Sequence, residues 1–485
     1  MADQIHYQSV RQMSDALLAK DISVIELADA HFERIEQIDD RVGSYLAVTP
    51  ERAREQATTA QASIDSGNVT PLTGVPMQLK DNLATRGIPT TCSSLMLENF
   101  VPPYDSTVTA SLANTGAILL GKGNMDEFAM GSSTETSAYK LTRNPWDLSR
   151  VPGGSSGGPA AAVAGGLAPY SLGSDTGGSI RQPASFCGIV GLKPTYGLVS
   201  RFGLIAFASS LDQIGPLTRT VEDAALVMNA IAGPDTNDST SILRPVIDYS
   251  IGLKDGVKGL RIGVVPEYFG EGIDPQVAQL TRKAIQQLEF LGAEVSEVSL
   301  PNSKAALAVY YILAPSECSA NLARYDGVKF GFSTHDAPNM MAALEATREG
   351  GFGTEVKRRM MMGTYALSSG YYDAYYKKAQ QVRTLIRREF DAAFEKVDVL
   401  ITPTTPTTAF KLGEIQDPVV MHANDVCTVP ANIAGIPGIS IPCGAINGLP
   451  VGLQILGPHL SEATLLRTAY AYEQSTSWHA QHPTI

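Results

Sequence analysis

Apolar residues recur at helical spacing over the first part of the chain. Ser9-Val-Arg-Gln12 and Ser23-Val-Ile-Glu26 both have the form of a capping box, which marks a helix N-terminus. The apolar residues after Ser23 fall on one face of a helix, and Pro50 opens a third helix that ends near Gly67. The pattern predicts N-terminal helices over about residues 1–67, which pack on the outside of the main body or offer a face to a partner.

From residue 74 onward, short continuous apolar runs alternate with helical patterns. Such runs predict buried strands at 74–80, 117–120, 260–265, 294–300, 397–401, 438–441 and 451–456. Helices are predicted at 108–114, 159–168, 220–233, 275–291 and 461–474, and 303–396 is largely helical. This alternation indicates an α/β fold with a central mixed β-sheet covered by helices on both faces. We expect a single large domain over 1–485, with the more polar segment 234–258 as a flexible insertion.

The composition is that of an ordinary globular chain, with 44% hydrophobic and 18% charged residues among 485. The net charge of −12 argues against direct nucleic-acid binding, because phosphate contacts need clustered Lys and Arg. Five cysteines lie far apart, without a Cys-x-x-Cys pair or a close Cys/His cluster, so we expect no metal site and a reducing compartment. The first residues lack a signal-peptide pattern and no apolar run is long enough to span a membrane, which together predict a cytoplasmic protein.

Two glycine- and serine-rich segments, 150–159 and 173–183, flank a run of small residues that has the character of a tightly packed helix. Ser155 and Ser179 are 24 residues apart, and each follows Gly-Gly. A pair of glycine-rich turns would explain each segment alone. Glycine also lets backbone N–H groups approach a reacting atom. Because the same element occurs twice around one helix, we favour a site that holds a serine nucleophile, its oxyanion hole and a proton-relay serine.

Lys80 ends the apolar run 74–80 and is the candidate base. A lysine at a strand end can extend its charge to water, whereas a partly buried lysine has a lowered pKa and can accept a proton from a serine. Serine–lysine pairs are a recognised variant of the serine triad. The expected oxyanion-hole donors are the backbone N–H groups of Thr176, Gly177, Gly178 and Ser179. For the charged residues Arg181 and Asp175, the alternative to a role in catalysis is a purely structural ion pair with each other.

Other catalytic motifs fit this chain less well. Gly153-Gly-Ser-Ser-Gly157 matches the G-x-S-x-G nucleophile elbow, which should follow a strand and precede an acid and a histidine. However, 148–152 is a poor strand, and the downstream histidines lie in no recognisable motif. His422 is kept as a candidate for the histidine base. Asp175-Thr-Gly177 resembles an aspartic-protease signature with Asp65-Ser-Gly67 as its mate, but the second segment ends a helix and the chain is not all-β. No phosphate-binding glycine loop is present in a strand–turn–helix context.

Three motifs carry a family resemblance. The chain resembles the amidase signature family at residues 153–158 (Gly-Gly-Ser-Ser-Gly-Gly), 173–183 and 188–194. By this resemblance the signature core would span about residues 70–220. The resemblance implies a Ser–cis-Ser–Lys triad in which Ser179 is the acyl-forming nucleophile, Ser155 the bridging serine and Lys80 the base. It also implies a cis peptide bond before Ser155.

Longer runs at 124–135, 201–216 and 366–376 resemble the branch of this family that hydrolyses glutamine for tRNA-dependent amidotransferases, over nearly the whole chain. This resemblance implies a glutaminase with no cofactor of its own. Ammonia would pass to the B subunit of the amidotransferase, which uses ATP and Mg²⁺ to convert mischarged Glu-tRNA(Gln) to Gln-tRNA(Gln), and the small C subunit would clamp the two large ones. Pro159 departs from the small residue expected there.

The same resemblance implies a pocket for the charged groups of glutamine. Arg359 would face the α-carboxylate, Asp425 the α-ammonium, and Tyr310 would line the pocket. Ser132 would contact the substrate or the triad. Arg358 is next to Arg359 on a predicted helix, and either could be a solvated charge. A stand-alone amidase that acts on a small amide and a catalytically dead scaffold protein remain as alternatives.

Overall fold

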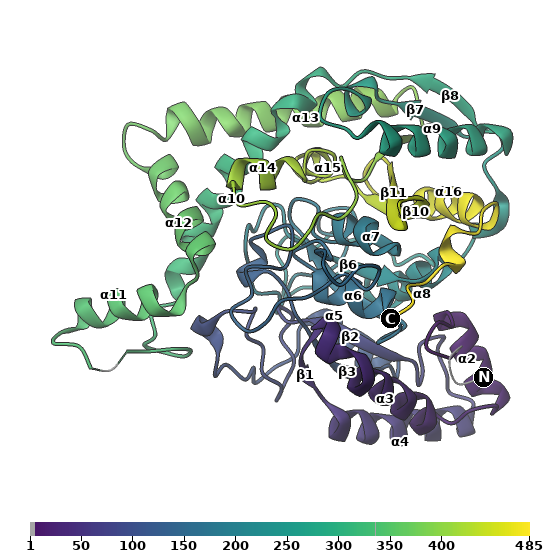
Figure 1. Cartoon of the computed structure of the whole chain (residues 1–485), viewed down its shortest axis with the longest axis horizontal. Helices are drawn as coiled ribbons and strands as arrows, with labels where there is room; N and C mark the ends of the chain where they lie inside the picture. Colours follow the sequence, from purple (N-terminus) through teal and green to yellow (C-terminus); the bar gives the residue numbers. More distant parts are fainter. Residues whose placement is uncertain (1–4, 335) are drawn as a thin grey trace.

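A mixed β-sheet of eleven strands runs through the centre of the computed structural model, which describes residues 5–334 and 336–485 (Figure 1). The strands are β1 (Tyr45–Val48), β2 (Pro76–Lys80), β3 (Ile118–Gly123), β4 (Tyr170–Asp175), β5 (Val190–Lys193), β6 (Gln213–Thr218), β7 (Arg261–Val264), β8 (Glu294–Glu297), β9 (Val399–Pro403), β10 (Gly438–Ile446) and β11 (Leu449–Leu456). Their order across the sheet is β1-β3-β2-β4-β6-β5-β10-β11-β9-β7-β8. β2 is parallel to β3 and β4, β7 is parallel to β8 and β9, and the remaining pairs are antiparallel.

Helices surround this sheet. The α-helices are α2 (Val10–Ala19), α3 (Val24–Val42), α4 (Pro50–Ser66), α5 (Thr107–Asn114), α6 (Gly157–Ala164), α7 (Arg181–Cys187), α8 (Val221–Ile231), α9 (Pro275–Phe290), α10 (Ala306–Asn321), α11 (Met340–Gly351), α12 (Thr354–Leu367), α13 (Lys378–Phe394), α14 (Pro418–Ala423), α15 (Val429–Ala434) and α16 (Glu462–Gln474). Both predicted capping boxes are formed, because Ser9 and Gln12 bond reciprocally, as do Ser23 and Glu26.

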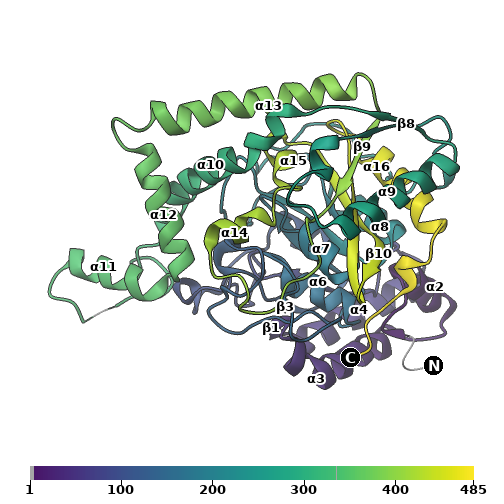
Figure 2. The ribbon, with the colours of Figure 1, turned by 45° about the horizontal axis from the view of Figure 1, so that its top comes forward.

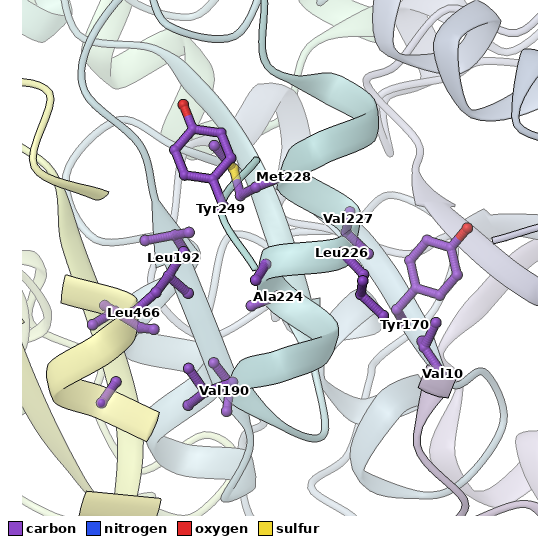
Figure 3. Packing of buried hydrophobic residues seen from close by; sticks show 14 of the residues in the cluster. Val10, Tyr170, Val190, Leu192, Ala224, Leu226, Val227, Met228, Tyr249 and Leu466 are labelled. Atoms are coloured by element: carbon purple, nitrogen blue, oxygen red, sulfur yellow. The ribbon is translucent and has the colours of Figure 1, made fainter. Parts of the chain in front are cut away.

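Side chains that alternate along the strands separate the two faces of the sheet. Ile214 of β6 lies in one cluster with α8 and α16, whereas Leu217, three residues on, lies in a second cluster with α6 and α7. Figure 3 shows part of the first cluster, where Leu192 of β5 lies between α8 and Leu466 of α16. Since every side chain of α6 and α7 is buried, these short helices are held between the sheet and the rest of the molecule.

The helices α10, α11, α12 and α13 form an arm at one side of the sheet (Figures 1 and 2). α11 lies at its outer end, far from the strands. The inner part packs through a separate apolar cluster that includes Leu313 of α10, Val356 of α12 and Ile386 of α13. α12 joins this cluster through Val356 and Met360, and its Gly363 and Ala366 are buried as well.

The expectation of one α/β domain with a mixed sheet covered on both faces is confirmed. The sequence patterns do not predict β1, β4, β5, β6, α7, α14 or α15. The segment 234–258 contains only a short 3₁₀ turn, η3 (Leu253–Asp255), and two of its aspartates accept hydrogen bonds from the body: Asp235 from Ser200 and Asp238 from the Arg201 N–H. Its flexibility stays a prediction. Within the described residues, no helix combines the length and hydropathy needed to cross a membrane.

Candidate active site

Lys80 lies at the end of β2 and is fully buried, so its charge does not reach water. Its Nζ is 2.7 Å from Ser155 Oγ, 2.9 Å from Ser156 Oγ and 2.9 Å from Ser174 Oγ. Ser174 comes from β4, the parallel neighbour of β2, and Ser155 and Ser156 precede α6. The sheet and the small-residue helix together bring three hydroxyl groups to one amine.

The surroundings of Lys80 favour its neutral form. Burial lowers the pKa of this amine to about 7 from its ordinary value of 10.5, although Cys92, Asp126, Asp175 and Asp212 act in the opposite sense. A substantial fraction of the amine is therefore neutral at physiological pH. A neutral amine has a lone pair that can accept a proton, which is what a base for a serine requires.

The two Gly-Gly-Ser elements are adjacent in the fold. The peptide bond between Gly154 and Ser155 is cis, which confirms the expectation from the family resemblance. Ser156 donates its backbone N–H to the carbonyl oxygen of Ser179 at 3.2 Å, which joins the two segments. Ser155 is fully buried, whereas Ser179 keeps an exposed fraction of 8%. Of the two serines, Ser179 is thus the more exposed.

The segment from Thr176 to Ser179 is held from both sides. Thr176 donates its hydroxyl to Asp212 at 2.6 Å, and Thr428 donates its hydroxyl to the carbonyl of Gly177 at 2.7 Å. Gly178 donates its N–H to Asp175 at 2.8 Å, so in this structure that group is occupied by a carboxylate. The oxyanion-hole roles of the four residues stay predictions.

Asp175 and Arg181 form a buried ion pair at 3.1 Å, which is the structural pairing considered from the sequence. Burial alone would raise the pKa of Asp175, but the Arg181 guanidinium holds it at about 2. Arg181 also donates to the Thr428 carbonyl, Gln454 and Asn432. This network fixes the turn that carries Ser179.

The predicted substrate-binding residues lie on a second side of the site. Ser132 donates its hydroxyl to Asp425 at 2.7 Å, and burial raises the pKa of Asp425 to about 7 against the opposing effects of Ser132 and Arg359. Arg359 is 3% exposed and its Nε lies 2.6 Å from Glu355, whereas Arg358 is more exposed and pairs with the same glutamate. Tyr310 packs against Gly177: a Cβ added there would lie 2.8 Å from its ring. Tyr310 thus lies against the segment that carries Ser179, Ser132 and Asp425 contact each other, and the roles of all four predicted residues stay predictions.

A family model described as Amidase matches residues 26–466 of the chain. The chain belongs to the amidase family. A protein of Cyanothece sp. that is named as the A subunit of glutamyl-tRNA(Gln) amidotransferase is 58% identical to this amidase over 480 residues, which cover 98% of this chain and 100% of the relative. A protein of the same name from Moorella thermoacetica is 59% identical over 484 residues, or 99% of each chain. The crystal structure of the Thermotoga maritima protein of that name has 42% identity and a TM-score of 0.81, and the match covers 97% of this chain and 95% of that one.

A cavity of about 240 Å³ opens beside the substrate-binding residues of this amidase. Ser132, Glu355, Arg359 and His422 are among its lining residues. The His422 ring stacks on Tyr311 with the ring centres 3.6 Å apart, and burial and the nearby arginines lower its pKa to about 3. His422 is therefore a neutral wall of the cavity, and its contacts do not support the histidine base that the sequence left open. The cavity is large enough for an amino acid and has charges of both signs at one side.

Sequence reasoning missed two residues that contact the candidate triad and a third that contacts one of them. Ser156 and Ser174 both bond Lys80, and Asn82 donates its amide to Ser174 Oγ at 2.9 Å. Ser156 is adjacent to Ser155, and Asn82 is two residues from Lys80, so proximity in the sequence was the available signal. The contact of Ser174 depends on the pairing of β2 with β4, which the sequence patterns do not predict. Among the described residues, no cluster of His, Cys, Asp and Glu suits a metal ion.

Proposed function

We propose that this amidase is the glutamine-hydrolysing A subunit of a glutamyl-tRNA(Gln) amidotransferase. The observation that carries the proposal is identity of 58–59% over nearly the whole chain to proteins of that name. The buried contact between Lys80 and Ser155 supports a functional active site, which argues against a dead scaffold. Arg359, which lines the cavity, and Asp425, which bonds the lining residue Ser132, suit the α-carboxylate and α-ammonium of glutamine, which argues against an enzyme for apolar amides.

The reaction begins with neutral Lys80. Ser179 Oγ attacks the γ-carboxamide carbon of glutamine, its proton passes to Ser155, and the Ser155 proton passes to Lys80 Nζ. The carbonyl oxygen becomes an oxyanion, which the backbone N–H groups of Thr176, Gly177 and Ser179 stabilise. When the C–N bond breaks, the amide nitrogen takes the proton back through Ser155 and leaves as ammonia. Water then cleaves the glutamyl ester and releases glutamate.

The ammonia is passed to the B subunit, where ATP and Mg²⁺ serve to amidate the glutamate of mischarged Glu-tRNA(Gln). The small C subunit joins the two large ones, and the heterotrimer works in the cytoplasm. The acidic chain fits this division, because the tRNA would be held mainly by the partner. This chain needs no cofactor of its own for the hydrolysis.

The test is to trap the glutamyl ester from labelled glutamine in the complex isolated from its source. We expect label on the wild-type chain and none on the Ser179→Ala variant, while Ser66→Ala, a change of an exposed serine on α4, keeps normal labelling. Undiminished labelling of Ser179→Ala would refute the nucleophile. Recovery of the chain alone, fully active on simple amides, would favour the stand-alone amidase instead.

A further inference from the structure

Glu127 is a buried carboxylate that the proposed mechanism does not use. It is 2% exposed, and no Lys or Arg of the described residues lies within ion-pair distance of it. It accepts a hydrogen bond from Ser94 Oγ at 2.5 Å and from the Gly353 N–H at 2.9 Å to Oε2 and 3.1 Å to Oε1. Because a buried carboxylate is unfavourable without such bonds, these contacts fix Glu127 in one place.

Gly353 directly precedes α12, the helix that carries Glu355 and Arg359. A carboxylate at this end of a helix also interacts favourably with the helix dipole. A Cβ at Gly353 would lie 2.2 Å from Glu127 Oε2, so only glycine allows this close approach. Ser94 Oγ also lies 3.2 Å from the carbonyl oxygen of Gly351. The start of α12 is therefore fastened to the core at Glu127.

The residue before Glu127 holds another loop that lines the cavity. Asp126 accepts bonds from the Thr134 N–H and from the Thr136 hydroxyl, each at 2.9 Å. These bonds shape the loop that contains Ser132, whose hydroxyl meets Asp425. Two adjacent acidic residues thus hold two segments that line the cavity, the loop with Ser132 and the start of α12.

We propose that Glu127 is a positioning residue that sets the place of Arg359 relative to Ser132 and Asp425, and so sets the affinity for the α-carboxylate of the substrate. The inference rests on the proposed function, because it takes glutamine as the substrate. Lys80, Ser155 and Ser179 lie on other elements, so loss of Glu127 affects binding more than chemistry. In steady-state terms, KM rises while kcat changes little.

The first test compares Glu127→Ala and Glu127→Gln with the wild-type complex in glutamine hydrolysis. Alanine leaves the Gly353 N–H without a partner, and we expect KM to rise about tenfold with kcat within about threefold. Glutamine keeps one acceptor oxygen for that N–H, so its KM should stay within about threefold of wild type. Equal KM values for all three proteins would overturn the proposal.

The second test is a double-mutant cycle with Gly353→Ala. In the wild-type background the new Cβ meets the Glu127 carboxylate, and KM should rise as in Glu127→Ala. In the Glu127→Ala background that oxygen is gone, so Gly353→Ala should add little. Strict additivity of the two effects would show that Glu127 does not act through Gly353 and would also overturn the proposal.

Glu473 provides a matched control, because it is 4% exposed and accepts the N–H of Val221, the first residue of α8, at 2.8 Å. It lies on α16 and does not line the cavity. Glu473→Ala should leave KM for glutamine unchanged. A KM rise equal to that of Glu127→Ala would mean that a general destabilisation of the fold, and not the position of Arg359, raises KM, and it would overturn the proposal. If the wild-type complex did not hydrolyse glutamine at all, the proposed function would fail instead.

Discussion

Replacing Lys80 with methionine should make the protein more stable at neutral pH while it abolishes glutamine hydrolysis. Burial lowers the pKa of this amine from 10.5 to about 7, so between these pH values the folded state binds fewer protons than the unfolded state. Stability therefore rises with pH over that window, and at pH 7 Lys80 opposes folding. Methionine has a similar length and no charge to desolvate.

The magnitude follows from the difference of about 3.5 between the two pKa values. At 1.36 kcal/mol for each pH unit, Lys80 opposes folding by about 4 kcal/mol at pH 7 and by roughly 1–2 kcal/mol at pH 9.5. Methionine gives up hydrogen bonds to Ser155, Ser156 and Ser174, each worth about 1 kcal/mol. We therefore expect a net gain of about 1 kcal/mol at pH 7 and a net loss at pH 9.5.

Urea unfolding at the two pH values, with both proteins in parallel, measures this crossover. Lys122→Met is a matched control, because Lys122 is equally buried but pairs with Asp81 at 3.3 Å. Its loss leaves a buried carboxylate unpaired and should destabilise the protein at both pH values. If Lys80→Met were less stable than wild type by the same amount at both, Lys80 would be charged in the folded protein, and the argument for a neutral base would be wrong.

Two further predictions concern stability. Arg181→Met removes the partner of buried Asp175 and should cost about 3–5 kcal/mol in urea unfolding, whereas a loss below about 1 kcal/mol would contradict the structural role of the pair. Burial raises the pKa of Glu473 to about 8 from 4.5, so the folded state binds more protons between these values and stability falls as pH rises. Glu473→Gln should flatten that fall by on the order of 1 kcal/mol per pH unit between pH 5.5 and 7.5, and parallel stability curves for the two proteins would disprove it.

Most strands of the sheet were predictable from the sequence, but the three consecutive strands β4, β6 and β5 and the edge strand β1 were not. The strand–helix–strand pattern at 260–300 is plain because its strands are apolar and its helix is amphipathic. β4 is Tyr170-Ser-Leu-Gly-Ser-Asp175, and its polar residues hide the strand. Ser171 is tolerated there because it donates to the Gln78 carbonyl at 2.9 Å. Such partners belong to neighbouring strands, so no local pattern predicts them.

In the candidate site, too, some residues were predictable from local motifs and others were not. Lys80, Ser155 and Ser179 could be proposed from motifs, since each stands beside residues whose spacing has a chemical reason. The pairing of Arg359 with Glu355 was not predicted, although the two residues lie within about one helical turn. The contact of Ser132 with Asp425 joins residues 293 positions apart, and the anchoring of α12 at Glu127 joins positions 226 apart. Contacts at that range depend on the whole topology.

The network around Arg181 has a consequence for the order in which the protein can mature during synthesis. Every proposed triad residue lies within the first 179 residues, but Arg181 takes Asn432 and Gln454 as partners, and β5 is flanked by β10. A nascent or truncated chain that ends before residue 428 carries the complete triad and an unpaired edge on β5, and its Arg181 keeps Asp175 but lacks the acceptors on Thr428, Asn432 and Gln454. Such a chain would be inactive and prone to pair with other strands. A premature stop late in the reading frame is therefore as damaging to this enzyme as one near its start.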